Sequence, residues 1–413
     1  MGSSAAGSPM RRAVLLGGPG VEGGINGPGE AASTWQQAEA LGRVTPSGLG
    51  IDLLDDPAAL LDPLGKLGVD EVFLRIAWPK IEPKEGAIDD EALRRYGALV
   101  AELRGAARSV HLVLSDGTAP AWFGVEGWLM PSAPDRFAPY VSAVLERLAD
   151  GIDGVVSLEE PADWVMAGWL SGSAPPFRRF ALPDAIAALD TMLACHRVAE
   201  GIVAGWPRIE HTLLSSSGIP GDVESRLLGR VTRRRLPGPL LGAIDRWSPG
   251  RALRDRDEAD ASQRLLAVGR GVVPPGMLAG ELWSLAGHDE TGSIAAALSA
   301  EGQALSISHR HVVARLNERG RRLPGRPPQR VIELGQILAE IDQAPEGRCH
   351  RLFLGELVDR WRYGTTSSCE GLLGVDRSRG RRGFRLLSTD QSGANSIAEI
   401  AELLRISTRP SAS

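Results

Sequence analysis

The fold is decided by the stretch Gly68-Val-Asp-Glu-Val-Phe-Leu-Arg-Ile-Ala-Trp-Pro-Lys-Ile-Glu-Pro83. Within it, residues Glu71–Trp78 have the apolar, β-branched and aromatic composition of a buried strand. A helical pattern follows over Asp89–Arg104, where apolar side chains recur every three or four positions. A buried strand followed by an amphipathic helix predicts one βα unit of a parallel sheet.

The same alternation continues in both directions from this stretch. Repeated about eight times, it is typical of a parallel sheet that closes into a single-domain (β/α)₈ TIM barrel of the α/β class. The predicted strands are Ala13–Gly17, Glu71–Trp78, Ser109–Ser115, Gly154–Glu159, Ile209–Ser215, a segment near Gly271–Leu285, Ala304–Ser308 and Arg351–Leu357. The predicted helices are Asp89–Arg104, Pro134–Ala149, Pro183–Ala204, Ile294–Ala300, Arg330–Ile341 and Ser396–Arg405.

The length and composition agree with one such barrel and exclude several other classes. The 413 residues are 43% hydrophobic and 5% aromatic, and a net charge of −5 gives no reason to expect nucleic acid. No apolar run approaches the length of a membrane span, so we predict no membrane partner. Three cysteines without paired spacing indicate a reducing, cytoplasmic environment, and Arg in place of almost every Lys fits a bacterial, GC-rich genome.

We predict three segments along the chain. Residues 1–10 are rich in Gly and Ser and read as a flexible leader, and residues 408–413 as a disordered tail. Residues 11–407 form the barrel. The oligomeric state cannot be read from the sequence.

Ionisable residues follow four of the predicted strands. In a barrel of this kind the carboxyl ends of the strands face the active site, which makes these residues candidates for a shared pocket. They are Asp116 after the third strand, Glu159 and Glu160 after the fourth, His309, Arg310 and His311 after the seventh, and Glu356 and Asp359 on the eighth.

Several stretches resemble family 1 glycoside hydrolases, the β-glucosidase family. The block from Gly68 to Pro83 resembles the family's second-strand segment, and Leu158-Glu-Glu-Pro161 resembles its Asn-Glu-Pro motif. Further similarities are Val21-Glu-Gly23 with Trp35, Pro120-Ala-Trp122, Leu357-Val-Asp359 and Gly371-Leu-Leu-Gly-Val-Asp376. The resemblance implies a (β/α)₈ barrel and places Glu160 at the position of the family's catalytic acid/base, one of the two carboxylates of a retaining glycosidase.

Other functional positions of the family are replaced in this chain. In our alignment the nucleophile of its Thr-Glu-Asn-Gly motif, at the end of the seventh strand, corresponds to His309. The sugar-holding Gln, His and Asn correspond to Gly20, Asp116 and Glu159, and the last-strand Trp and Glu-Trp pair correspond to Gly355 and Arg362-Tyr363. Without a carboxylate nucleophile, ordinary retaining hydrolysis cannot follow its usual route.

We therefore expect a repurposed enzyme of specialised metabolism that performs acid/base chemistry on a small molecule. Elimination, cyclisation, isomerisation and atypical glycoside cleavage all remain open. Glu160 is the expected proton donor, with His309 or Asp116 as its catalytic partner. An inverting cleavage would instead need Asp116 or Glu356 to activate water.

The remaining side chains at the predicted mouth are expected to bind the substrate. We assign this role to Glu159, Glu356, Asp359, Trp122, Trp361, Arg310 and Arg362, with Trp164 and Trp169 as further members of an apolar wall. Arg310 and Arg362 suit an anionic substrate group. His309 and His311 lack a third ligand at suitable spacing, so we predict no metal, and Gly17–Gly24 lacks a dinucleotide fingerprint, so we predict no cofactor.

Two alternatives stay open from the sequence. The chain could be a pseudoglycosidase that binds a glycan or a protein partner without chemistry. It could also be a true β-glycosidase whose nucleophile lies elsewhere, for example at Glu281, Glu290 or Glu301.

Overall fold

The structure is a computed structural model. It describes residues 10–27, 29–48, 50–51, 53–54, 57–105, 109–216, 282–286, 311–313, 329–343, 351–365, 371–376, 385–386 and 396–407. Residues 1–9 of the predicted leader, the predicted tail, the strand over Ala304–Ser308 and the helix over Ile294–Ala300 lie outside these residues.

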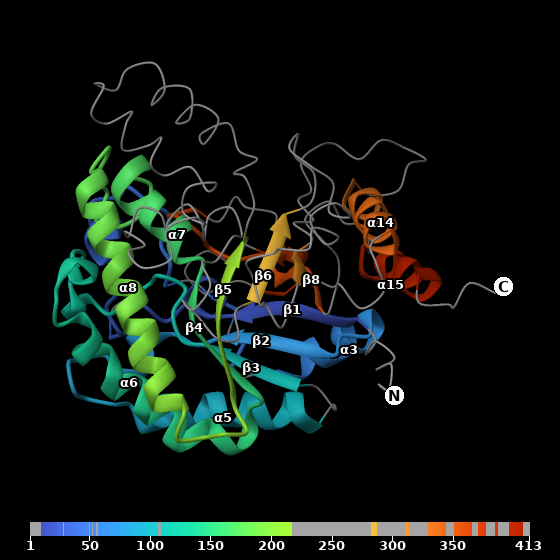
Figure 1. The fold of residues 1–413 in the computed structure, drawn as a ribbon, viewed down its shortest axis with the longest axis horizontal. Helices are drawn as coiled ribbons and strands as arrows, with labels where there is room; N and C mark the ends of the chain where they lie inside the picture. Colours follow the sequence, from blue (N-terminus) through green and yellow to red (C-terminus); the bar gives the residue numbers. More distant parts are fainter. Residues whose placement is uncertain are drawn as a thin grey trace, which may run out of the picture.

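Eight parallel strands form a closed barrel (Figure 1). Each strand pairs with the next in chain order, and the last pairs with the first through Arg11↔Arg351 and Ala13↔Phe353, which closes the sheet. The strands are β1 (Arg11–Gly17), β2 (Glu71–Arg75), β3 (Ser109–Val113), β4 (Gly154–Glu159), β5 (Glu210–Ser216), β6 (Leu282–Ala286), β7 (His311–Val313) and β8 (Arg351–Val358). The predicted fold class is confirmed.

Helices cover the outside of the barrel. Helix α5 (Asp90–Gly105) shows why they form: Asp89 Oδ1 accepts the backbone N–H groups of Glu91 and Ala92 at 2.9 and 3.0 Å, which caps the amino end. Its buried face then packs on the sheet through Leu93, Tyr96, Leu99, Val100 and Leu103. The other long helices are α3 (Ala58–Leu67), α6 (Ala133–Leu148), α8 (Leu182–Val203), α14 (Gln329–Asp342) and α15 (Ser396–Ser407).

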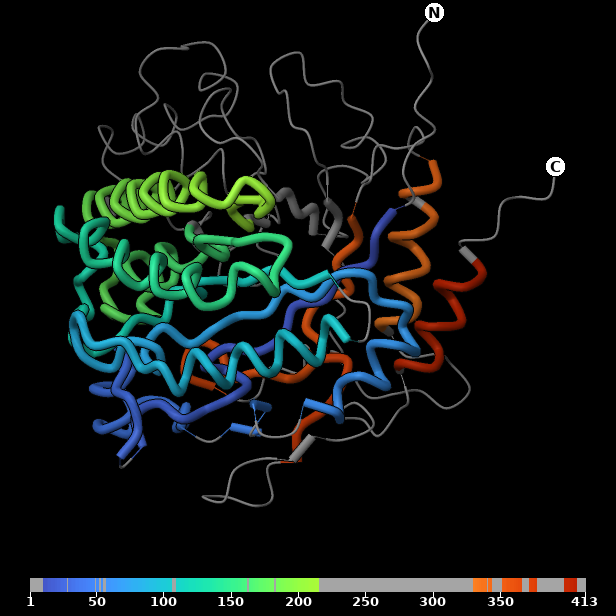
Figure 2. The backbone as a smooth tube through the Cα atoms, turned by 90° about the horizontal axis from the view of Figure 1, so that it is seen from below, coloured from blue at the N-terminus to red at the C-terminus, as the bar shows by residue number. Residues whose placement is uncertain are grey.

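Short elements fill the loops at the ends of the strands. They are helices α1 (Pro19–Glu22), α2 (Gln36–Ala40), α4 (Trp78–Ile81) and α7 (Pro161–Val165), a π-helix over Met166–Ser171, and 3₁₀ turns over Ala121–Phe123, Gly127–Leu129 and Ala149–Gly151. Strand β9 (Gly371–Leu373) adds to β8, and β10 (Val375–Asp376) pairs with β11 (Arg385–Leu386). In Figure 2, α14 and α15 lie side by side, and α15 also packs on α3.

The inside of the barrel is arranged in layers that strand β2 illustrates. Its alternate residues Glu71, Phe73 and Arg75 all face inward. Phe73 lies in an apolar middle layer with Ala13, Leu15, Val113, Val156, Leu214 and Phe353. Glu71 is at the amino end of the strand and Arg75 at the carboxyl end, so both ends of the barrel interior carry buried charge.

Most predicted elements agree closely with the structure. Strand β4 has the predicted bounds, and α5, α6 and α8 each lie within one residue of prediction. The seventh strand differs: β7 begins at His311, whose partner Arg351 is the first residue of β8. His311 therefore lies at the amino end of the barrel and not at its mouth. None of the helices among the described residues is long and apolar enough to cross a membrane.

Candidate active site

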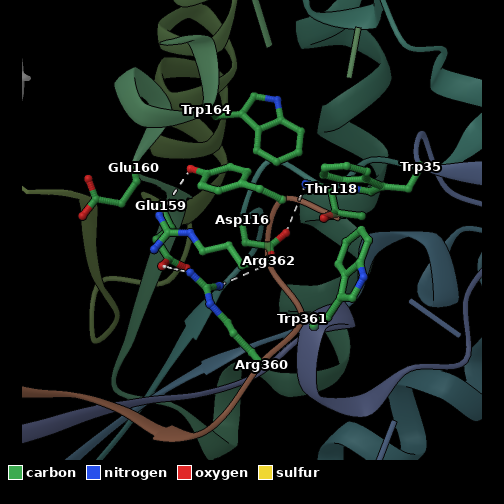
Figure 3. A pocket seen from close by; sticks show the side chains of 11 residues that line it. Trp35, Asp116, Thr118, Glu159, Glu160, Trp164, Arg360, Trp361 and Arg362 are labelled. Atoms are coloured by element: carbon green, nitrogen blue, oxygen red, sulfur yellow. Dashed lines mark hydrogen bonds and ion pairs between the residues drawn. The ribbon is translucent and has the colours of Figure 1, made fainter. Parts of the chain in front are cut away.

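A pocket opens at the carboxyl ends of the strands, where the fold places active sites (Figure 3). It encloses about 420 Å³, counted up to its open mouth. Segments that follow β1, β3, β4 and β8 contribute its walls. The lining residues are Gly20, Trp35, Asp116, Thr118, Glu159, Glu160, Trp164, Arg360, Trp361, Arg362 and Tyr363.

The floor beneath the pocket is a buried guanidinium held by two carboxylates. Arg75, which is 1% exposed, donates Nη1 and Nη2 to the two oxygens of Glu356, each at 2.7 Å. It also donates Nε and Nη2 to Glu159, the latter at 2.7 Å. These bidentate ion pairs fix both glutamates against the end of β2.

Two β-bulges turn these glutamates into the barrel. Between β4 and β5, Val156 pairs with Thr212 and Glu159 with Leu214, so β4 advances three residues while β5 advances two. Between β8 and β1, Phe353 pairs with Ala13 and Glu356 with Leu15. Side chains on a regular strand alternate between the inside and the outside of the barrel. Glu159 is three positions after the inward residue Val156, and Glu356 is three after the inward residue Phe353, so on regular strands both would face outward. The extra residue in each bulge turns them inward.

Arg360 extends the ion-pair network towards the pocket. Its guanidinium lies 3.3 Å from Glu356, 3.7 Å from Glu159 and 3.9 Å from Asp116. Burial alone would raise the pKa of Glu159, but the charge and hydrogen bonds of Arg75, helped by Arg360, lower it to about 2. The pKa of Glu356 is lowered too, because Arg360 and Arg75 outweigh its burial and the repulsion from Glu159.

Glu160 lies apart from this network, at the rim of the pocket. The backbone of Glu160 is left-handed, with φ of 50°, and its N–H donates to the carbonyl of Leu214 at 2.7 Å. In Figure 3 its carboxylate extends away from the ion pairs of Glu159. A left-handed backbone costs free energy in a residue other than glycine, and such strain is concentrated at functional sites. The adjacent residues Glu159 and Glu160 therefore point in different directions.

Asp116 also lines the pocket and is tied to its own loop. Its Oδ1 accepts the N–H of Thr118 at 3.1 Å, and its Oδ2 faces Arg360. Arg362 also lines the pocket, and its Nη2 is 3.8 Å from Asp163 and 3.3 Å from the hydroxyl of Tyr363. The pocket therefore contains both acidic and basic side chains at its accessible level.

Aromatic side chains form the upper wall. The ring of Trp35 meets those of Trp164 and Trp361 edge to face, with centroids 6.0 and 4.6 Å apart. Trp361 is fixed by its indole N–H, which donates to the carbonyl of Thr45 at 2.7 Å. Trp169, predicted as part of this wall, is fully buried and does not line the pocket.

Two predicted binding residues lie elsewhere. The indole N–H of Trp122 donates to the carbonyl of Glu82 at 2.7 Å, and Trp122 does not line the pocket. Asp359 is buried and its Oδ1 accepts the N–H of Gly371 at 2.7 Å, so it holds β9 against β8. Both residues make structural contacts away from this pocket, and a role for them in binding substrate stays a prediction.

The predicted catalytic position on the seventh strand changes with the register. His309 and Arg310 lie outside the described residues. Both come before β7 in the chain, whereas we had expected them to follow the seventh strand. His309 therefore precedes the described strand β7 in the chain, and its role as the catalytic partner of Glu160 stays a prediction.

The sequence analysis missed Arg75 and Arg360. The signal for Arg75 was present, because Glu71, Phe73 and Arg75 share one face of a strand and Arg75 is at the carboxyl end. Within the described residues, no cluster of three or more His, Cys, Asp or Glu side chains could hold a metal ion.

Comparisons with known proteins identify the scaffold. Residues 18–202, which contain β1 to β4 and Glu160, match the model of glycosyl hydrolase family 1. The match covers a little under half of the chain. The β-glucosidase of an Agrobacterium species is 32% identical over 113 residues, which is 27% of this chain and 24% of that protein. The rice chloroplast protein named β-glucosidase-like SFR2 is 27% identical over 127 residues, 29% of this chain and 20% of its own.

The solved structures of family 1 enzymes share the fold over nearly the whole chain. A β-glucosidase from Thermotoga maritima in complex with noeuromycin has a TM-score of 0.70 at 16% identity, covering 98% of this chain and 100% of that one. The aligned part of this chain spans only about a fifth to a quarter of the length of the two curated relatives. The solved structures therefore show the barrel fold for nearly the whole chain, and the family match itself lies in residues 18–202.

Proposed function

We propose that this protein is a glycoside-hydrolase-derived enzyme that acts on a small molecule with Glu160 as its acid/base. The observation that carries the proposal is the separation of Glu160 from Glu159 by the bulge in β4. Glu159 and Glu356 are held ionised by Arg75, so neither can donate a proton near neutral pH. Glu160 lies at the accessible rim, at the position that resembles the acid/base of family 1.

Asp116 is the proposed partner of Glu160 within the described pocket. It lines the same cavity, and its carboxylate is oriented by Thr118 and Arg360. A carboxylate so held could accept a proton from water or substrate while Glu160 donates one. Elimination, isomerisation and inverting cleavage each need such a pair. An anionic group on the substrate would be met by Arg362, whose side chain is 22% exposed against 6% for Arg360. The cytoplasmic location and the role in specialised metabolism remain proposals.

The decisive experiment compares Glu160→Gln with Glu146→Gln, an exposed control on α6. Both proteins are incubated with a metabolite extract and with aryl β-D-glycosides, and products and bound species are followed by mass spectrometry. We expect Glu160→Gln to lower turnover by about 10²–10⁴-fold while it retains bound substrate. For aryl glycosides, the loss should be large with a phenol leaving group and small with 2,4-dinitrophenol, which needs no proton. Unchanged turnover would refute the role of Glu160, and binding without any turnover in the wild type would favour the pseudoglycosidase.

A second candidate function is a retaining β-glycosidase whose nucleophile follows β7. The observation that favours it is the register of β7, which begins two residues after His309 and pairs Val313 with Phe353. The first carboxylate after Val313 in the sequence is Glu318, in Leu316-Asn-Glu-Arg-Gly320. This stretch keeps the Glu and Gly of the Thr-Glu-Asn-Gly motif, and it lies outside the described residues.

The other carboxylates considered for a relocated nucleophile are Glu281, Glu290 and Glu301, and they also lie outside the described residues. Glu281 immediately precedes β6 in the chain, which is the wrong end of a strand for a nucleophile. Incubation with a 2-deoxy-2-fluoro glycoside, followed by peptide mass spectrometry, separates the two functions. A label on Glu318 would establish the retaining mechanism. Turnover of other substrates without any labelled residue would favour the acid/base enzyme.

A further inference from the structure

The indole of Trp164 occupies the space above the carboxyl end of β3. Gly117 lies there with φ of 93°, and a methyl group added to it would overlap the six-membered ring of Trp164. Trp164 is 5% exposed and lines the pocket. The ring can lie so close to the β3 loop only because residue 117 has no side chain.

Trp164 is also anchored to the proposed acid/base. It belongs to α7, which starts directly after Glu160, and its backbone N–H donates to the carbonyl of Glu160 at 3.0 Å. Its ring meets Trp35 at 78° and lies 6.3 Å from that of Tyr363. The π-helix Met166–Ser171 follows without a break, and π-helical turns occur frequently at functional sites. The indole, which is carried by the helix after β4, therefore contacts the loops after β1, β3 and β8. The backbone hydrogen bond fixes its position relative to Glu160.

We propose that Trp164 determines the specificity of the pocket by limiting the size of the group that reaches Glu160. This rests on the proposed function only in that the pocket binds a small molecule. The wall at Trp164 is apolar and aromatic, and the floor at Glu159 and Arg360 is charged. A substrate with one apolar ring face and one polar edge fits between them. Because Gly117 leaves no space behind the indole, a larger ring cannot push Trp164 aside.

The test measures binding and not turnover, in the Glu160→Gln background. The probes are β-D-glucosides with methyl, phenyl, naphthyl and biphenyl groups, together with cellobiose, each titrated separately and followed by native mass spectrometry. Trp164→Ala should strengthen binding of the two largest aryl probes at least about 10-fold relative to methyl β-D-glucoside, since steric fit in an apolar pocket has effects of this size. Trp164→Phe should give an intermediate change.

Gly117→Ala supplies an independent test of the same contact. The added methyl group must displace the indole, so Gly117→Ala should change the affinity for the small probes when Trp164 is present. In a protein that already carries Trp164→Ala, adding Gly117→Ala should leave these affinities unchanged. The backbone strain at φ of 93° is common to both backgrounds and cancels in this comparison. Trp206→Ala, which removes a half-buried indole outside the pocket, is the control for general loss of stability.

If the ratios of affinity between large and small probes are the same in every variant, Trp164 does not determine specificity. The same conclusion follows if none of the variants binds any probe. This outcome is distinct from failure of the proposed function, in which Glu160→Gln retains turnover whatever the size selection. If Trp164→Ala does not fold, as judged by near-ultraviolet circular dichroism, Trp164→Phe and Gly117→Ala decide the question with the same probes.

Discussion

Replacing Arg75 by Met should lower the free energy of unfolding, because it leaves two buried carboxylates, Glu159 and Glu356, without the charge that neutralises them. Burial and Arg75 together leave the pKa of Glu159 at about 2 against 4.5 for an ordinary Glu, which corresponds to about 3 kcal/mol of folding free energy at neutral pH. Glu356 contributes in the same direction. Without Arg75 both carboxylates would be buried without their bidentate partner, with Arg360 and the more distant charge of Arg362 left to neutralise them. We therefore expect Arg75→Met to lose about 3–5 kcal/mol at pH 7, as found when one partner of a buried ion pair is removed.

The assay is urea unfolding between pH 7 and pH 3, with Arg94→Met as the matched control. Arg94 pairs with Glu91 at the exposed surface of α5, where water screens the pair, so its loss should leave the unfolding free energy nearly unchanged. The folded pKa of Glu159 is depressed, so its contribution is present above the unfolded pKa of 4.5 and disappears as the pH falls towards 2.

The deficit of Arg75→Met should therefore shrink as the pH is lowered, because the unpaired carboxylates of the variant become protonated. The triple variant Arg75→Met, Glu159→Gln, Glu356→Gln should recover part of the loss at pH 7, since it leaves no unpaired charge at these positions. A deficit below about 1 kcal/mol at pH 7, or one that stays constant down to pH 3, would refute this account of the floor.

Two further perturbations test the backbone and a second buried cluster. Gly355→Ala should lower the melting temperature, because Gly355 has φ of 86° in the bulge that turns Glu356 inward. An alanine in this left-handed conformation costs about 1–2 kcal/mol. The control is Gly201→Ala at an open position within α8, which should be neutral or stabilising by about 0.5–1 kcal/mol. His196 is buried against Ser157, and burial, helped by the charges of His211 and a neighbouring arginine, lowers its pKa from 6.5 to about 3. Below pH 6.5 the unfolded chain binds a proton at His196 that the folded chain does not bind, so the free energy of unfolding should fall as the pH drops. In His196→Asn, the melting temperature measured in thermal scans should depend less steeply on pH over this range.

The sequence was sufficient for the barrel because its strands and helices carry clear periods. The inward residues Glu71, Phe73 and Arg75 repeat every second position, and the cap at Asp89 marks the start of the next helix. The place of Glu160 followed from the same logic, since it comes directly after a strand that the apolar run Gly154–Leu158 defines. Local pattern and tertiary structure agree in this half of the chain.

The bulges and the seventh strand could not be obtained in this way. Pairing across two strands decides where an extra residue is inserted, and Gly355 was the only local signal for the bulge in β8. For the seventh strand, the alternating run Ala304–Ser308 resembles a strand as well as the short β-branched run His311–Val313 does. The choice between two runs a few residues apart determines which side chain follows the strand. It therefore decides whether His309 or a residue later in the chain, such as Glu318, is predicted at the carboxyl end of the seventh strand.

Perturbed ionisation does not by itself locate the active site of this barrel. At the amino end, Glu71 is buried against Arg351 and His111, and its pKa is lowered to about 2, as is that of Glu159 at the other end. Both carboxylates are therefore locked in the ionised form by arginine. In the described part of the chain, the network at the carboxyl end adjoins a pocket, and the bulge in β4 there is followed directly by Glu160, which lines that pocket. The buried ion pairs thus form a charged floor that fixes the geometry of Glu159 and Glu356, and this is why we propose Glu160 and neither of these glutamates as the proton donor.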